Sequence, residues 1–161
     1  MERLWSPWRA KYIESAPGSG TNGCVFCEIS SDADHDDENL VVYRSPECFI
    51  VLNLYPYISG HLLIVPHQHI PDLQSAAKHI TDELMDLTKR SETVLQNVYR
   101  PAGFNIGINL GAAAGAGIVD HIHIHILPRW NGDTNFMSTV GGTRVLPEDL
   151  QTSYSKLKGK F

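Results

Sequence analysis

Five stretches of the chain are rich in β-branched and other apolar residues and are separated by turn-forming residues. Runs of this length and composition are typical of β-strands. They span residues 40–44 (LVVYR), 48–54 (CFIVLNL), 61–66 (HLLIVP), 104–111 (FNIGINLG) and 121–128 (HIHIHILP). Because only short connections separate the first three, we expect them to pair as a small antiparallel meander.

The hydrophobic period changes to that of a helix between residues 81 and 99. Four apolar residues recur there at helical spacing, namely Leu84, Leu87, Leu95 and Val98. Thr81 is a candidate N-cap, and Pro101 stops the helix. Together with the strands, this segment predicts an α+β fold in which a long helix packs on a mostly antiparallel sheet of about five strands.

Two segments follow neither period. Residues 1–23 carry three aromatic side chains and then the flexible sequence PGSGTNG, which predicts an arm that docks through its tryptophans, followed by a linker. We therefore divide the chain into this arm, a candidate to reach another subunit, and a single domain over residues 24–161. Residues 30–39 (SSDADHDDEN) are acidic and rich in turn formers, so we interpret them as a solvated, mobile insertion rather than a metal site.

Composition narrows the class of protein. The chain has 161 residues, is 42% hydrophobic and carries a net charge of −5. A domain of this size buries roughly two-thirds of its unfolded surface without disulfides. The acidic charge argues against a nucleic-acid polymer as partner, because such binding needs a basic field. Any phosphate that the protein binds must therefore be small and locally held.

The cysteines and the apolar runs indicate the compartment. Three cysteines are an odd number, and the N-terminal sequence has no secretory apolar run, so we expect reduced thiols. No stretch approaches about 18 uninterrupted apolar residues, which argues against a membrane partner. We expect a cytoplasmic protein.

Residues 120–130 (DHIHIHILPRW) place three histidines at alternate positions with isoleucines between them. A strand has a side-chain period of two, so His121, His123 and His125 should share one face and the isoleucines the core face. A chance arrangement is disfavoured, because six ring nitrogens would need partners.

Two chemical interpretations of these histidines remain. A three-histidine catalytic zinc site is disfavoured, because the outer Cα atoms of an extended strand lie about 13 Å apart at ~3.3 Å per residue, too far for one tetrahedral ion. In the other, one imidazole acts as nucleophile or base while its neighbours orient it and donate to phosphate oxygens. We favour this second interpretation.

The small residues of the sequence GAAAGAG, from Gly111 to Gly117, precede the histidines. Such residues let a ligand approach the backbone, and consecutive N–H groups can form a concavity that holds an anion. A plain flexible hairpin connection is the alternative. The neighbouring histidines favour the anion-binding interpretation.

The alternation of histidine and apolar residues resembles the signature of the histidine triad (HIT) superfamily of nucleotide hydrolases and transferases. Residues 60–70 (GHLLIVPHQHI) are similar to its second marker segment, and NLYPY to its first nucleotide-binding strand. With RLWSPWRAKYI near the N-terminus, the chain resembles the bacterial branch that includes diadenosine tetraphosphate phosphorylase, over roughly residues 3–147 apart from the acidic loop. The resemblance implies a HIT-like fold and a homodimer in which two subunits join their sheets.

The resemblance also implies catalytic roles. His123 falls where the family has its nucleophile, which attacks the α-phosphorus to give a nucleotidyl-imidazole intermediate. A neutral ring is needed, so a backbone carbonyl should hold one N–H. His125 would contact the phosphate oxygens or the bridging oxygen.

The nucleotide-binding roles follow in the same way. Asn109 would donate to phosphate, and Asn53 stands where the family usually has an acidic residue that holds the ribose hydroxyls. Gly117 is a departure, since many members carry glutamine or serine there to position water or the leaving group. The absence of such a side chain favours orthophosphate as acceptor, although the backbone donors of Ala116 and Gly117 are available to substitute. Gly115, Ala116 and Gly117 are all expected to bind the nucleotide.

A second site is implied by the CVFC pair. Some HIT proteins bind a structural zinc through such a pair, a histidine of the second marker segment and the first triad histidine, positions that match Cys24, Cys27, His69 and His121. This Cys₂His₂ set suits a closed tetrahedral site. A redox pair and buried apolar thiols are the alternatives. His67 is a less favoured ligand, and Cys48 is expected in the core.

We therefore expect an enzyme that cleaves phosphoanhydride bonds of nucleotides or dinucleoside polyphosphates, such as diadenosine tetraphosphate. The reaction would be phosphorolysis or hydrolysis through a covalent nucleotidyl-histidine, with orthophosphate as a candidate partner. Three alternatives are a nucleotide-binding regulatory module with little turnover, a nucleoside phosphoramidate hydrolase and a zinc-dependent hydrolase.

Overall fold

The computed structural model describes residues 23–135, 138, 140, 142 and 146–161. The predicted N-terminal arm, apart from Gly23, lies outside these residues. The assignment of residues 24–161 to one domain stays a prediction.

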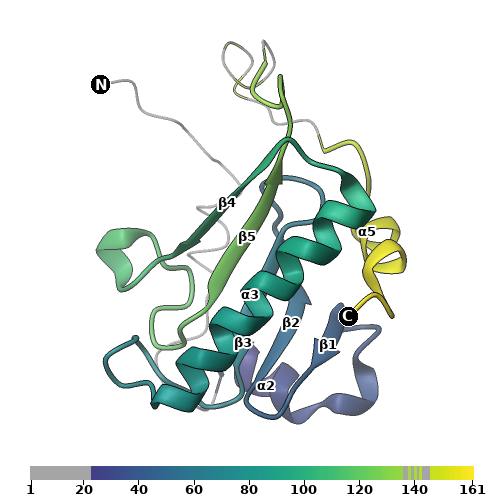
Figure 1. The fold of residues 1–161 in the computed structure, drawn as a ribbon. Coiled ribbons are helices and arrows are strands. Elements are labelled where there is room, and N and C mark those ends of the chain that lie inside the picture. The colour runs from purple at the N-terminus through teal and green to yellow at the C-terminus, as the bar shows by residue number, and fades with distance from the viewer. Residues whose placement is uncertain (1–22, 136–137, 139, 141, 143–145) are drawn as a thin grey trace.

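A single antiparallel sheet of five strands forms the centre of the structure (Figure 1). Its order is β1-β2-β3-β5-β4, so the first three strands form the predicted meander. The strands are β1 (Val41–Arg44), β2 (Cys48–Leu52), β3 (Leu62–Pro66), β4 (Gly103–Ile108) and β5 (Ile124–Arg129). The predicted α+β class and the number of strands are confirmed.

The prediction that all three histidines lie on one strand is wrong. Strand β5 begins at Ile124, so His121 and His123 precede it. The backbone N–H of Ile122 donates to the carbonyl of Ile70, at 2.7 Å, and not to a neighbouring strand. The alternation of side chains nevertheless continues through this segment, because Ile122 is buried in the same cluster as Ile124.

The long helix α3 (Lys78–Tyr99) begins three residues before the predicted start. Ala77 is its N-cap, without a side-chain hydrogen bond, so the prediction of Thr81 as N-cap is wrong. The Thr81 hydroxyl instead donates to the carbonyl of Lys78 inside the first turn. The predicted apolar face is confirmed: Leu84, Leu87 and Leu95 are buried, and Val98 packs beside them.

Two short helices were not predicted from the sequence. They are α2 (Val25–Ser31) and α5 (Leu150–Leu157), and two 3₁₀ turns, η1 (Ala33–His35) and η2 (Ala112–Ala114), complete the described elements. Helices this short are marginal alone and are stabilised mainly by tertiary packing. Helix α5 buries Tyr154 and Leu157.

The acidic segment is largely exposed, as its interpretation as a solvated insertion predicts, but it also has local structure. It contains η1, and Asp36 accepts two hydrogen bonds from the Arg44 guanidinium, at 2.9 and 2.7 Å. The same guanidinium donates to the carbonyls of Ile29 and Ser30 at the end of α2. The Tyr154 hydroxyl donates to Asp37. Asp36 and Asp37 thus bind partners that are distant in sequence, while most of the segment remains exposed.

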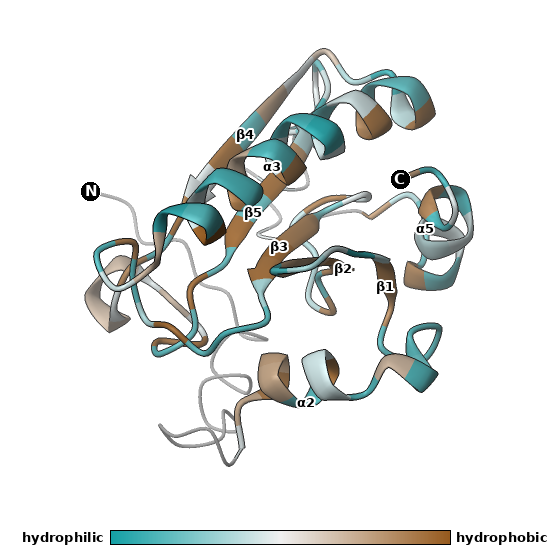
Figure 2. Cartoon of the chain, turned by 60° about the horizontal axis from the view of Figure 1, so that its bottom comes forward, coloured by the Kyte–Doolittle hydropathy of each residue, from teal (hydrophilic) through white to brown (hydrophobic). Residues whose placement is uncertain are grey.

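Helices pack on both faces of the sheet. Helix α3 lies on one face and α2 on the other (Figure 2). The larger core cluster includes buried residues of α3 and α5 and the isoleucines between the histidines, Ile122, Ile124 and Ile126. It also contains Cys48, which was predicted to lie in the core. The smaller cluster contains Phe26 of α2 with Phe49 and Val51 of β2. None of the described helices is long and apolar enough to cross a membrane.

Candidate active site

The register of the sheet brings a fourth histidine to the predicted triad. Leu63 of β3 pairs with His125 of β5, and His61 comes two residues before Leu63, so its side chain lies on the same face as His125. His61 is fully buried, and its Nε2 lies 2.9 Å from Nδ1 of His125. His61 was not predicted from the sequence as a site residue. Its spacing of two from Leu63 would have placed it on this face only once the strand pairing was known.

The hydrogen-bond partners of His61 define the tautomers of both rings. The backbone N–H of Tyr57 donates to Nδ1 of His61, at 3.2 Å, so this nitrogen is an acceptor. In the neutral ring the proton therefore lies on Nε2, which donates to Nδ1 of His125. The neutral His125 ring then carries its proton on Nε2. It can donate that proton, or a hydrogen bond, to an oxygen.

His123 has the opposite arrangement. Its Nδ1 lies 2.9 Å from the backbone carbonyl of His121, so Nδ1 carries the proton and Nε2 keeps a lone pair. Burial lowers the pKa of His123, because the charged ring is disfavoured, while the carbonyl contact acts in the other direction. The side chain is only 5% exposed. A neutral imidazole with a lone pair on Nε2 meets the requirement for a nucleophile.

The candidate nucleotide-binding asparagines lie on either side of these rings. Ile108 pairs with Ile124, so Asn109, which follows β4, lies beside the His123 segment and on the same face. Asn53 follows β2, and its side-chain amide nitrogen lies 3.3 Å from Nδ1 of His61. Its side-chain oxygen accepts a hydrogen bond from the backbone N–H of Tyr55.

The glycine and alanine connection forms turns of its own. The N–H of Gly115 donates to the carbonyl of Ala112, at 3.0 Å, and that of Ala116 to Gly111, at 3.4 Å. In this conformation these two donors are engaged within the loop. The predicted contacts of Gly115, Ala116 and Gly117 with a phosphate stay a prediction.

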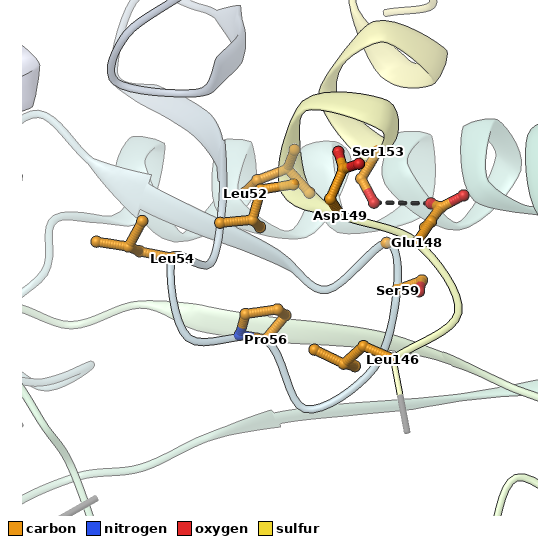
Figure 3. Close-up of a pocket in the computed structure, with 10 residues that line it drawn as sticks. Leu52, Leu54, Pro56, Ser59, Leu146, Glu148, Asp149 and Ser153 are labelled. Atoms are coloured by element: carbon orange, nitrogen blue, oxygen red, sulfur yellow. Dashed lines mark hydrogen bonds between the residues drawn. The ribbon is translucent and has the colours of Figure 1, made fainter. Parts of the chain in front are cut away.

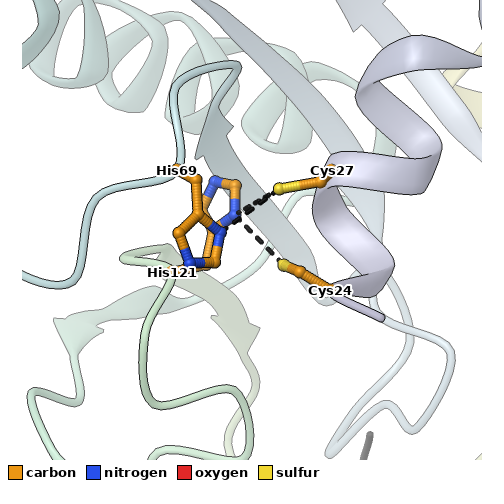
Figure 4. A group of neighbouring side chains, drawn as sticks. All are labelled: Cys24, Cys27, His69 and His121. Atoms are coloured by element: carbon orange, nitrogen blue, oxygen red, sulfur yellow. Dashed lines mark hydrogen bonds between the residues drawn. The ribbon is translucent and has the colours of Figure 1, made fainter. Parts of the chain in front are cut away.

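The four predicted metal ligands converge on one point (Figure 4). One potential ligand atom from each of Cys24, Cys27, His69 and His121 lies within 4.8 Å of every other. Sγ of Cys24 lies 3.3 Å from Nδ1 of His121, and Sγ of Cys27 lies 3.2 Å from Nδ1 of His69. Cys24 is the N-cap of α2, Cys27 lies in its first turn, and the histidines come from two other segments. A bound ion would therefore tie distant parts of the chain together.

The orientation of His121 fits metal binding. Its Nε2 donates to the carbonyl of Pro66, at 2.9 Å, which leaves Nδ1 unprotonated and directed at the cysteines. A histidine ligand usually donates its second ring nitrogen to such an acceptor. Burial lowers the pKa of His121 to about 4, so the ring is neutral near pH 7, as ligation requires.

His67 lies outside the cluster, as predicted. Its Nδ1 accepts from the Ser30 hydroxyl, at 2.8 Å, and its Nε2 donates to the carbonyl of Ser45, at 3.0 Å. Both ring nitrogens are therefore used to join α2 to the sheet.

A cavity of about 250 Å³ lies beside the connection between β2 and β3 (Figure 3). Leu54, Pro56 and Ser59 of that connection line it, together with Leu146 and the start of α5. The described residues that line it include no histidine. The connection thus contacts the histidines through Asn53 and Tyr57, and the cavity is separate from them.

Comparison with known proteins agrees with this geometry. The HIT domain family matches residues 35–132. AP-4-A phosphorylase of Mycobacterium tuberculosis is 41% identical over 157 residues, which are 94% of this chain and 80% of that protein. The asymmetrical bis(5'-nucleosyl)-tetraphosphatase of Schizosaccharomyces pombe is 32% identical over 93 residues, 58% of this chain and 50% of that protein.

A solved structure shares the fold. It is a zinc-bound histidine triad family protein from Mycobacterium smegmatis, which superposes with a TM-score of 0.70 at 28% identity. The match covers 88% of this chain and 94% of that one.

Proposed function

The chain belongs to the HIT domain family, and from that premise we propose that it cleaves the phosphoanhydride bonds of dinucleoside polyphosphates such as diadenosine tetraphosphate. The observation that carries the proposal is the neutral His123 ring, whose Nδ1–H is held by the His121 carbonyl. Binding a nucleotide does not require a lone pair on a buried imidazole, whereas attack on phosphorus does.

The reaction has two steps. Nε2 of His123 attacks the α-phosphorus, the bond to the bridging oxygen breaks, and its electrons go to the leaving polyphosphate. The Nε2–H of His125 donates to that oxygen as its negative charge develops. An acceptor then attacks the nucleotidyl-histidine and releases His123. Asn109 and Asn53 are proposed to hold the phosphate and the ribose.

Orthophosphate is the proposed acceptor. Gly117 has no side chain that could hold a water molecule for attack, so the site is poorly suited to hydrolysis. The name of the M. tuberculosis relative, AP-4-A phosphorylase, supports phosphorolysis.

Product analysis tests this proposal. Purified protein is incubated with diadenosine tetraphosphate, with and without orthophosphate. Attack at an α-phosphorus releases ATP, and the nucleotidyl group then becomes ADP if phosphate accepts it or AMP if water does. ADP and ATP in a phosphate-dependent reaction would support phosphorolysis, and AMP and ATP would indicate hydrolysis. Tight binding without any product would favour a nucleotide-binding module instead.

We propose that Cys24, Cys27, His69 and His121 hold one zinc ion. The two thiols and two imidazoles match the ligands and coordination number that structural zinc prefers. Because the set is complete without water, a bound zinc would stabilise the fold and would not activate a reactant. A reducing compartment such as the cytoplasm would keep both thiols available.

We also propose a homodimer in which two sheets join. Strand β4 lies at one end of the sheet order, and its Ile106 is 47% exposed. An exposed apolar edge strand is suited to pairing with another chain. Sedimentation at micromolar concentration should show a dimer, and Ile106→Lys should shift it toward monomer. A native protein that sediments as a monomer would reject the proposal.

His61 is predicted to support His125. In His61→Ala the Nδ1 of His125 loses its donor, so the His125 ring no longer has a fixed tautomer with the proton on Nε2. We expect kcat to fall on the order of 10²-fold, the lower end of what general acid catalysis supplies, with KM within a few-fold of native.

The matched control for this substitution is His79→Ala. His79 lies on α3 with its side chain 64% exposed, so its removal should leave kcat unchanged. Steady-state kinetics of both variants check the prediction. Native kcat in His61→Ala would show that His125 does not depend on this hydrogen bond.

A further inference from the structure

Phe26 lies between the two cysteines of the metal cluster and contacts the proposed nucleophile. Its ring centroid is 5.0 Å from that of His123, with an interplanar angle of 60°, and 5.4 Å from that of His121, at 79°. Both are edge-to-face contacts. Phe26 is 4% exposed and is the buried residue of α2. The residue that α2 buries is therefore in contact with the candidate catalytic centre.

One hydrogen bond and two ring contacts restrain the His123 ring. His123 precedes β5, so the strand ladder does not hold its backbone. Its Nδ1 is fixed by the His121 carbonyl. The His125 ring makes a second edge-to-face contact, with centroids 4.9 Å apart. Phe26 supplies a third restraint, and rotation of the ring would move Nε2 away from the line of attack.

Helix α2 is short, so tertiary contacts fix its position. It has seven residues, too few for a stable isolated helix. Arg44 donates to two carbonyls at its C-terminal end, and the Ser30 hydroxyl donates to His67. At its N-terminal end Cys24 and Cys27 contact His121 and His69. Phe26 is thus held from both ends of the helix.

We propose that Phe26 is a positioning residue, which keeps the His123 ring in the orientation that directs Nε2 at phosphorus. This inference rests on the proposed function, because it assigns His123 the role of nucleophile. Displacement of a reacting group by about 1 Å can cost on the order of 10²-fold in rate. Loss of the Phe26 ring should therefore affect the chemical step more than substrate binding.

The test uses Phe26→Leu and Phe26→Met in the full-length protein. Both keep an apolar side chain, and methionine comes close to the volume of phenylalanine, so one of them is expected to fold. We expect kcat to fall on the order of 10- to 100-fold while KM stays within about 2-fold of native. A fall in kcat without a rise in KM indicates a positioning role, whereas loss of a substrate contact would raise KM.

Phe49→Leu is the matched control. Phe49 is fully buried in the same cluster as Phe26, but its ring stacks on His67, at 5.4 Å. This substitution removes a comparable buried ring near α2 without touching His123. We expect a similar loss of thermal stability and near-native kcat in the folded protein.

A second measurement needs no substrate. In the native protein labelled with ¹⁵N-histidine, the Nδ1–H proton of His123 should give a protected NMR signal, because it donates to the His121 carbonyl. The signal should broaden or exchange rapidly in the Phe26 variants and persist in Phe49→Leu. If the native protein cleaves no dinucleotide, the proposed function fails while this comparison still tests the contact.

Three results would overturn the proposal. The first is a Phe26 variant with native kcat and an unchanged His123 signal. The second is a rise in KM alone, which would make Phe26 a substrate contact. The third is a loss of kcat in Phe49→Leu equal to that in the Phe26 variants. Such a result would mean that any loss of packing in the smaller core cluster lowers kcat.

Discussion

His123→Ala and His123→Asn should lose turnover by on the order of 10³-fold or more, which corresponds to about 4 kcal/mol of transition-state stabilisation. Without His123 the acceptor must attack phosphorus directly, and the covalent intermediate cannot form. Nucleotide affinity should change comparatively little, because Asn53, Asn109 and the loop at residues 111–117 are proposed to supply most ground-state contacts. The loss should therefore appear in kcat.

Rapid quench with labelled nucleotide checks the role directly. The native enzyme should give an acid-labile nucleotidyl-protein adduct, and the His123 variants should give none. His125→Ala serves as comparison, with a smaller loss on the order of 10²-fold, because His125 acts on leaving-group charge and not as the attacking atom. Near-native turnover in His123→Ala, or an adduct mapped to another residue, would reject the assignment.

Removal of zinc should strongly lower the stability of the native state. An ion present at about 1,000 times its dissociation constant stabilises the native state by about 4 kcal/mol. Loss of this stabilisation on removal of the ion should lower the melting temperature of a domain of this size by about 8–16 °C. Chelation, Cys24→Ser and Cys27→Ser should each produce this loss, while turnover of the folded fraction falls far less than in His123→Ala.

Metal analysis and thermal unfolding test this together. The native protein should contain about one zinc ion per chain, and the two variants should contain much less. Cys48→Ala is the control, because Cys48 is fully buried in the larger core cluster, away from the metal ligands. The melting temperature of this variant should still fall when chelator is added. Native protein that carries no zinc while its thiols are reduced would reject the site.

The sequence by itself determined the features that depend on local periodicity and residue type. Alternating or β-branched apolar runs predicted five strands, and helical spacing predicted the buried face of α3. The alternation from His121 to Ile126 predicted which side chains enter the larger core. The four metal ligands followed from a family resemblance, and the structure brings their side chains together.

The tertiary structure alone decided the features that depend on contacts between distant segments. His61 is adjacent to His125 because β3 pairs with β5, a pairing that no local pattern reports. Helices α2 and α5 are too short for a periodic signal, and the sheet against which they pack stabilises them. The acidic segment is held by Arg44 and Tyr154, which are distant in sequence. Local propensity reports only the free energy of a segment in isolation, whereas these features depend on contacts that exist only once the chain has folded.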